Sequence, residues 1–249
     1  MKASKLILEK HKTILLELGR ILILFLIGFI LIGCAQTTAF QIADHIPARK
    51  KPMKVLLMPP DVLLFELYAG GLEEPKAAWT ASAREHIFES LKDYFQETGN
   101  EMVVYQPPPP GSTKEKEQHQ LLKLHEAVVR SILIHKYTEI FSLPTKKDVF
   151  EWSLGEGASR LRETQNADYA LFTYFRDTHT SEGRATLMIV GALFGLIVPG
   201  GYQAGIASLV DLRSGDFIWF NRLFRRSGDL RTRESVEETL TLLLKGIPL

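Results

Sequence analysis

The chain has 249 residues and a formal net charge of +1, from 30 Lys and Arg against 29 Asp and Glu. Residues 1–33 carry five basic and two acidic side chains, so the remainder holds 25 basic and 27 acidic residues, a balance of −2. A chain of this length can bury one proper core. Its near-neutral balance gives no reason to expect nucleic acid or an anionic surface as a partner.

The first 34 residues predict export. Five basic side chains precede residues 21–34, ILILFLIGFILIGC, which are apolar up to the single cysteine of the chain. This order is typical of a secretory signal peptide, and the run is shorter than the roughly 20 residues of a membrane-spanning helix. The alternative is an ordinary signal or anchor with an incidental cysteine.

Leu31-Ile32-Gly33-Cys34 resembles the lipobox of bacterial lipoproteins. The resemblance implies cleavage between Gly33 and Cys34, two acyl chains (such as palmitate) on the Cys34 sulfur and a third on the new N-terminus. Several acyl chains anchor a protein stably without a transmembrane helix. Ala35 stands where an Asp would retain such lipoproteins in the inner membrane, so the resemblance implies the outer membrane, with the domain facing the periplasm.

The mature chain is expected to have two parts. Residues 34–52 lack clear periodicity, and we expect them to form the lipidated N-terminus and a tether of about 18 residues, reaching at most roughly 60 Å. Residues 53–249 are expected to form one α/β domain. Since Cys34 is the only cysteine, a lipidated chain would have neither a disulfide nor a free thiol.

The first half of the domain predicts strands alternating with amphipathic helices. We expect strands over 53–58 and 102–105, and helices over about 75–98, 114–137 and 147–164, from apolar residues recurring every three to four positions. Residues 61–75 are either a strand extension or a packed loop. Pro107 to Pro110 are most simply a stiff connection.

The second half predicts a central strand over 168–175, a hairpin over 204–223 turning at Ser214-Gly215-Asp216, and a helix that Thr232 caps. Together these elements predict an α/β sandwich with a mixed sheet, helices packed on it, and a C-terminal hairpin and helix, preceded by a lipoprotein signal peptide.

Residues 187–198, LMIVGALFGLIV, are too few for a transmembrane helix. Burial is the commoner explanation of an apolar run, and we expect a buried hairpin or a tightly packed helical turn. The alternative is an insertion that touches a membrane or another copy of the chain, with Leu187 and Phe194 as candidate contacts.

The sequence holds no recognisable catalytic, metal or cofactor motif. His125-Glu126 begins like a zinc-protease motif, but Val129 stands at the second histidine position. Gly155-Glu156-Gly157 lies in a helical pattern and lacks the third glycine of a dinucleotide fingerprint. Strand-end carboxylates could meet in a hydrolytic cleft; they are Asp61, Asp168, Asp177 and Asp211.

A basic group surrounds Gly228 and Asp229: Arg225, Arg226, Arg231 and Arg233. A solvated loop is the simpler explanation. Contact with an acidic partner or a glycan is the alternative, with Arg225 and Arg226 as candidate contacts.

The segment Leu209–Asp216, followed by Trp219, is similar to the late hairpin of periplasmic lipoprotein domains. These are the curli secretion lipoprotein, the lipoprotein activators of penicillin-binding proteins and the N-terminal domain of the Tol-system β-propeller protein. The chain looks closest to uncharacterised proteobacterial lipoproteins that carry a strand like Ala167–Phe172 and a Pro199-Gly200-Gly201 segment. The resemblance implies a compact α/β fold and no catalytic residue.

We therefore expect a non-enzymatic outer-membrane lipoprotein without a cofactor, which binds another envelope protein or a component of peptidoglycan synthesis or secretion. The first alternative is an oligomeric secretion or assembly component that uses residues 187–198. The second, less favoured, is an envelope hydrolase.

Overall fold

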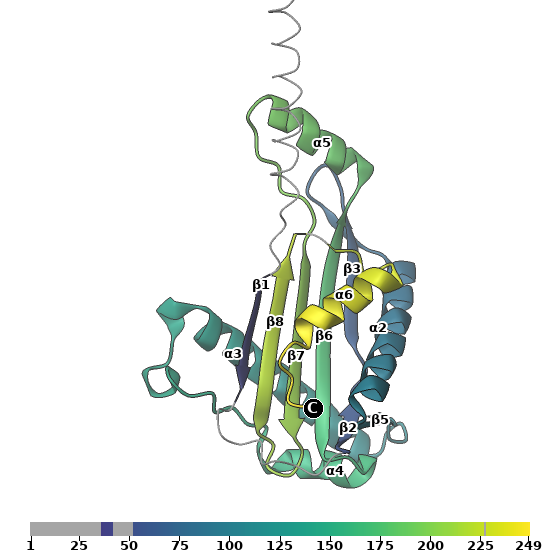
Figure 1. Ribbon diagram of the computed structural model, residues 1–249, viewed down its shortest axis with the longest axis vertical. Coiled ribbons are helices and arrows are strands. Elements are labelled where there is room, and N and C mark those ends of the chain that lie inside the picture. Colours follow the sequence, from purple (N-terminus) through teal and green to yellow (C-terminus); the bar gives the residue numbers. More distant parts are fainter. Residues whose placement is uncertain (1–35, 42–51, 227) are drawn as a thin grey trace, which may run out of the picture. The chain divides into compact units, whose positions relative to one another are not determined.

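The computed structural model describes residues 36–41, 52–226 and 228–249, which form a mixed eight-stranded sheet with helices on both faces (Figure 1). The strands are β1 (Gln36–Gln41), β2 (Lys54–Leu57), β3 (Asp61–Leu67), β4 (Glu73–Pro75), β5 (Glu101–Val104), β6 (Tyr169–Thr180), β7 (Gln203–Asp211) and β8 (Phe217–Arg225). The α-helices are α2 (Ala77–Thr98), α3 (Thr113–Tyr137), α4 (Ala158–Gln165), α5 (Glu182–Leu193) and α6 (Arg233–Leu243). The prediction of an α/β fold with a mixed sheet is confirmed.

Strand β6 lies in the middle of the sheet, whose main order is β1-β8-β7-β6-β2-β5. Two shorter strands share one of its edges: β2 pairs with its first half and β3 with its second half, both in parallel. Pro59 and Pro60 separate β2 from β3 because proline cannot donate to a ladder. Residues 61–67 are thus a strand extension, the first of the two options for this segment.

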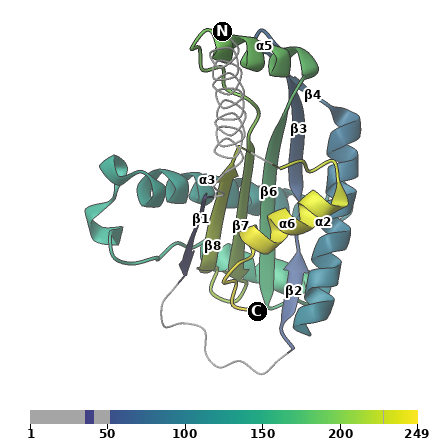
Figure 2. The ribbon, with the colours of Figure 1, turned by 45° about the horizontal axis from the view of Figure 1, so that its top comes forward.

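The helices cover the two faces of the sheet separately (Figure 2). Helices α2 and α6 bury Ile87, Leu91, Phe95, Val236, Leu240 and Leu243 against one face, with Trp219 and Phe175. Helices α3 and α4 bury Leu121, Ile132, Ala158 and Leu161 against the other, with Phe217 and Phe220. The odd and even positions of β6 enter different cores, so burying both faces stabilises the fold.

The predicted closing hairpin is confirmed as β7 and β8, which pair in antiparallel fashion. Gly215 has φ +81° in its turn, and a Cβ there would lie 2.3 Å from the carbonyl oxygen of Gly155. Only glycine fits this close approach, which brings the segment before α4 against the hairpin.

The prediction of a tether is wrong for residues 36–41, which form the edge strand β1 beside β8. The ring of Phe40 packs edge-on to Tyr137 at 5.1 Å and stacks on Phe150 at 6.0 Å. Backbone pairing at a sheet edge does not require alternating apolar and polar residues. Residues 36–41 lack this alternation, so their sequence did not predict a strand.

The predicted helix over 147–164 begins only at Ala158. Gly155 has φ +67°, a left-handed conformation that a helix cannot contain. The residues before it are irregular, yet Phe150 and Leu154 are buried as their spacing predicted.

The expectation of burial for residues 187–198 is wrong. Residues 182–193 form α5, which lies beyond the ends of β6 and β7 in both views (Figures 1 and 2). Of its residues, only Gly191 is buried.

Candidate functional site

The most unusual surface of the described protein is the apolar tip, the name used here for residues 185–199. Among the described residues, sixteen large apolar side chains are exposed, and seven of them lie here: Leu187, Ile189, Val190, Leu193, Phe194, Leu196 and Ile197. Ile197 is 94% exposed, Leu193 79% and Phe194 78%. Scattered exposed apolar residues are normal, whereas a contiguous group marks an interaction surface.

The apolar tip has a defined backbone. After α5, Gly195 (φ +75°) donates to the carbonyl of Ala192 at 3.1 Å, and Leu196 donates to that of Gly191 at 2.9 Å. These are the two bonds of a Schellman motif, which satisfies helix-end carbonyls. A Cβ on Gly191 would approach the Val198 side chain to 3.2 Å, so the returning chain packs closely on the helix.

The base of the apolar tip is fixed to the sheet. Arg184 donates to the carbonyl oxygen of Pro199 and, through Nη1 at 3.0 Å, to that of Ala69 in the β3–β4 connection. The amide of Gly201 donates to Thr180 Oγ1 at 2.7 Å. These bonds join the two ends of the tip and hold it to the adjoining strands.

The first described strand enters the sheet at the same end. Gln36 pairs with Phe224, which pairs with Ala204, which pairs with Arg176. This row crosses the sheet just before β6 leads into α5. Cys34 and Gly33 lie outside the described residues, but Cys34 precedes Gln36 by only two positions.

A pocket of about 450 Å³ lies next to the base of α5, lined by Trp79, His179, Ser181, Arg231 and their neighbours. The guanidinium of Arg231 stacks over Trp79 at 4.7 Å, bonds both oxygens of Asp229, and lies 3.1 Å from His179 Nδ1. Desolvation, followed by the charge of Arg231, lowers the pKa of His179. His179 is therefore a neutral acceptor for Arg231 at neutral pH.

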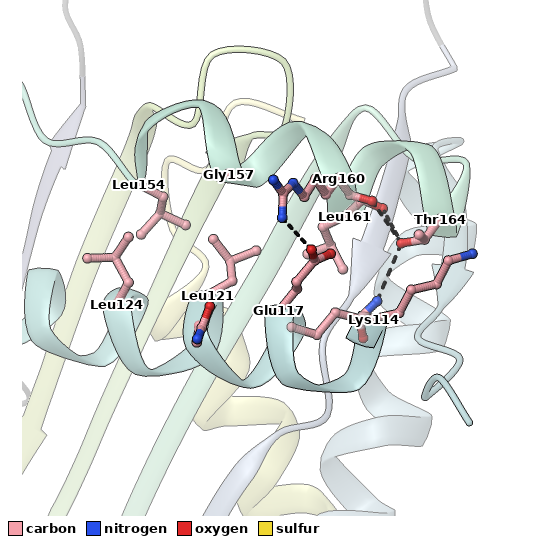
Figure 3. Close-up of a pocket in the computed structure, with 11 residues that line it drawn as sticks. Lys114, Glu117, Leu121, Leu124, Leu154, Gly157, Arg160, Leu161 and Thr164 are labelled. Carbon is pink, nitrogen blue, oxygen red and sulfur yellow. Dashed lines mark hydrogen bonds and ion pairs between the residues drawn. The ribbon is translucent and has the colours of Figure 1, made fainter. Parts of the chain in front are cut away.

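A second, smaller pocket of about 210 Å³ lies between α3 and α4 (Figure 3). Leucines form its floor: Leu121, Leu124, Leu154 and Leu161. At its rim, Arg160 pairs with Glu117 at 2.6 Å. Since both charges face solvent, this ion pair contributes little to stability. The pocket presents a small apolar patch between α3 and α4, which the ion pair connects.

The two candidate arginines lie in opposite environments. Arg225 is 3% exposed and bonds Gln203 Oε1, Thr239 Oγ1 and Glu238 Oε1 at 2.6–2.7 Å. The prediction that Arg225 contacts a partner is therefore wrong, because its donors are used inside the protein. Arg226 is exposed, as expected for a contact residue.

The strand-end carboxylates do not form one cluster. Asp168 and Asp211 lie near each other at one end of the β6–β7 pair, whereas Asp177 lies at the other end. Asp61 pairs with Tyr174, between these ends. Burial raises the pKa of Asp177 to about 6. The hydrogen bond that Asp177 accepts from the Leu230 amide at 2.8 Å lowers the pKa, but this effect is smaller than that of burial.

His125 is held by the sheet. Its ring stacks on Phe172 with centroids 3.8 Å apart, and its Nε2 lies 2.9 Å from Ser208 Oγ. Desolvation lowers the pKa of His125 to about 3. A neutral imidazole stacked between helix and sheet has a packing role.

Among residues 36–41, 52–226 and 228–249, no group of three or more His, Cys, Asp or Glu is placed to hold a metal ion. No helix within residues 52–226 or 228–249 is long and apolar enough to cross a membrane.

The apolar tip is recognisable in the sequence, but its exposure is not, and the pocket around Trp79 and Arg231 has no sequence signal. The pocket draws residues from β3, α2, β6 and the segment before α6. No local motif could have joined positions so far apart. The proximity of Gln36 to the tip end also required the unpredicted pairing of β1.

The chain matches no protein-family model and no curated protein. Among solved structures it is similar to the PelC dodecamer from Paraburkholderia phytofirmans in space group P6, with 13% identity and a TM-score of 0.37 over 84% of this chain and 97% of that chain. A variant PelC dodecamer from the same organism, in space group C2, gives 16% identity and a TM-score of 0.36 over 85% and 98%. Likeness at this level assigns neither a family nor a function to the chain.

Proposed function

We propose that this chain is a lipid-anchored, non-catalytic binding or scaffold protein of the bacterial outer membrane that faces the periplasm. Residues Leu31–Cys34 resemble the lipobox of bacterial lipoproteins, and we place the chain among these proteins. One observation carries the proposal: Gln36, two residues after Cys34, pairs into the sheet at the end from which the apolar tip projects. An acylated Cys34 would therefore hold the folded domain directly against the membrane.

The decisive experiment is metabolic labelling with a fatty acid in cells. Wild-type protein is expected to take up label and to run at the size of the processed chain, whereas Cys34→Ala should lose the label and accumulate as precursor. An unlabelled wild-type protein would refute the anchor. Turnover of a cell-wall substrate by the purified protein would refute the non-catalytic role.

The partner proposed for the domain is another envelope protein or a component of peptidoglycan synthesis or secretion. Photo-crosslinkers placed at Phe194 and at the exposed Arg226 sample the two surfaces named from the sequence. A crosslinker at Glu163, which is exposed on α4 and belongs to neither surface, is the matched negative control.

The second candidate is an oligomeric secretion or assembly component. The exposure of Leu193, Phe194 and Ile197 favours it, because unpaired apolar side chains can be buried between copies of the chain. Detergent-extracted protein should then crosslink to itself through the apolar tip. A protein that stays monomeric under these conditions would exclude this candidate.

A further inference from the structure

The apolar tip carries no charge. From Ala185 to Val210 the sequence contains no Asp, Glu, Lys, Arg or His. The nearest charges on α5 are Glu182 and Arg184, at the base, and the guanidinium of Arg184 is turned to the carbonyls of Pro199 and Ala69. A surface that contacts a protein usually has a polar rim, and this tip has none beyond its base.

Helix α5 satisfies its own backbone as far as its C-terminal end. The helix bonds of α5 continue into the two bonds of the Schellman motif at Gly195 and Leu196. The hydroxyl of Thr186 donates to the carbonyl of Glu182 at 2.9 Å. A segment that enters hydrocarbon must meet these conditions, because no water is present there to pair its N–H and C=O groups.

The position of the tip favours a lipid over a second copy of the chain. Gln36 lies at the same end of the sheet, and two residues can span at most about 7 Å. An acylated Cys34 would thus bring this end, and not the opposite end near α4, to the membrane surface. This orientation rests on the proposed lipid anchor.

We propose that the apolar tip inserts into the membrane interface as a second attachment beside the acyl chains of Cys34. Helix α5 has 12 residues and is about 18 Å long, too short to cross the hydrocarbon core. Ile189, Leu193 and Ile197 enter the acyl region, while Arg184 stays at headgroup level at the base. The partner is the lipid leaflet itself.

The sequence offers a clean test. Because acylated Cys34 has no thiol, a cysteine introduced elsewhere is the one reactive site. The acylated full-length mature protein is reconstituted in vesicles of phosphatidylethanolamine and phosphatidylglycerol. Phe194→Cys and Ile197→Cys are labelled with an environment-sensitive fluorophore, and Glu163→Cys, exposed on α4 near the opposite end of the sheet, is the matched control.

Lipids carrying a nitroxide on the acyl chain are expected to quench the labels at 194 and 197 and to leave the label at 163 bright. Absence of quenching at 194 and 197, with the protein still bound to vesicles, would overturn the insertion and leave the anchor intact. The fluorophores at 194 and 197 could instead change their emission with the number of protein molecules per vesicle while the nitroxide lipids leave them unquenched. That result would show that the tip contacts a second copy of the chain, and it would also overturn the insertion. Labelling of the parent protein at Cys34 would instead refute the proposed anchor.

Discussion

Arg184 and Pro199 join the two ends of the apolar tip: Nε and Nη2 of the arginine donate to one carbonyl oxygen at 3.0 and 2.8 Å. Because the same guanidinium also bonds Ala69, a single side chain connects the helix, the returning chain and the β3–β4 turn. Hydrogen bonds from a charged donor are stronger than neutral ones, so the shape of the tip depends on this residue.

Arg184→Ala should loosen the tip without unfolding the domain. Loss of the charged donor is expected to lower the free energy of local opening by about 1–2 kcal/mol, raising hydrogen exchange of residues 185–199 roughly tenfold. Hydrogen-exchange mass spectrometry measures this effect. Arg130→Ala, which removes an exposed pair with Glu126, is the control and should change nothing at the tip. Unchanged exchange in Arg184→Ala would show that the glycine contacts alone hold the loop.

Arg225→Met should destabilise the domain by about 3 kcal/mol, since Gln203 and Thr239 lose a buried donor. Arg226→Met, at the exposed neighbouring position, should change the free energy of unfolding by less than about 0.5 kcal/mol. Urea unfolding followed by circular dichroism compares the two. Equal effects would contradict a structural role for Arg225.

Asp177 should make the domain less stable as pH rises from about 4 to about 6. Burial raises its pKa from 3.8 to about 6, so in this range the folded protein binds more protons than the unfolded chain. The contribution is about 2–3 kcal/mol, because each pKa unit corresponds to roughly 1.4 kcal/mol. Asp177→Asn keeps an acceptor for the Leu230 amide and should abolish this pH dependence.

The control for Asp177 is Asp168→Asn, a partly exposed carboxylate paired with Arg162 at 3.3 Å. It should leave the decline between pH 4 and 6 in place. Urea midpoints measured across this pH range provide the comparison. A wild-type stability that rises with pH, with Asp177→Asn unchanged from it, would contradict the assignment.

Phe40→Ala should release β1 from the sheet edge. The ring lies between Tyr137 and Phe150 and is half-buried, so its removal should cost about 2 kcal/mol, below the 3–5 kcal/mol of a full core position. Urea unfolding gives the change, and faster exchange at residues 37–40 would localise it. Leu72→Ala, exposed at the β3–β4 turn, should have almost no effect. A Phe40→Ala protein of wild-type stability would mean that backbone pairing alone holds β1.

Some elements were predictable because local chemistry specified them. The turn at Ser214–Asp216 contains the glycine that its left-handed φ requires, and the helix over 75–98 has an apolar residue on every turn of one face. The apolar strand around Leu171 fits a position covered on both faces. In each case burial and backbone preference agree within a short segment.

Other features depended on distant parts of the chain. Residues 187–198 are apolar whether they are buried or exposed, and only the placement of α5 beyond β6 decides between these environments. A charged residue at a strand end is usually solvated, yet Arg225 is buried because Gln203 and Thr239 provide acceptors from β7 and α6. Polar Gln36–Gln41 became a strand because β8 offers an open edge.

The pairing of β1 bears on how the protein would carry a mechanical load. Gln36 to Gln41 face Phe224 to Trp219 in antiparallel register, and Gln36 is the end toward Cys34. A pull from an anchored Cys34, away from the domain, would act along the strand axis. Such a force shears all rungs of the ladder together instead of opening them one after another. The whole β1–β8 hydrogen-bond ladder would then resist a force on the domain, and β8 would pass that force to the rest of the sheet.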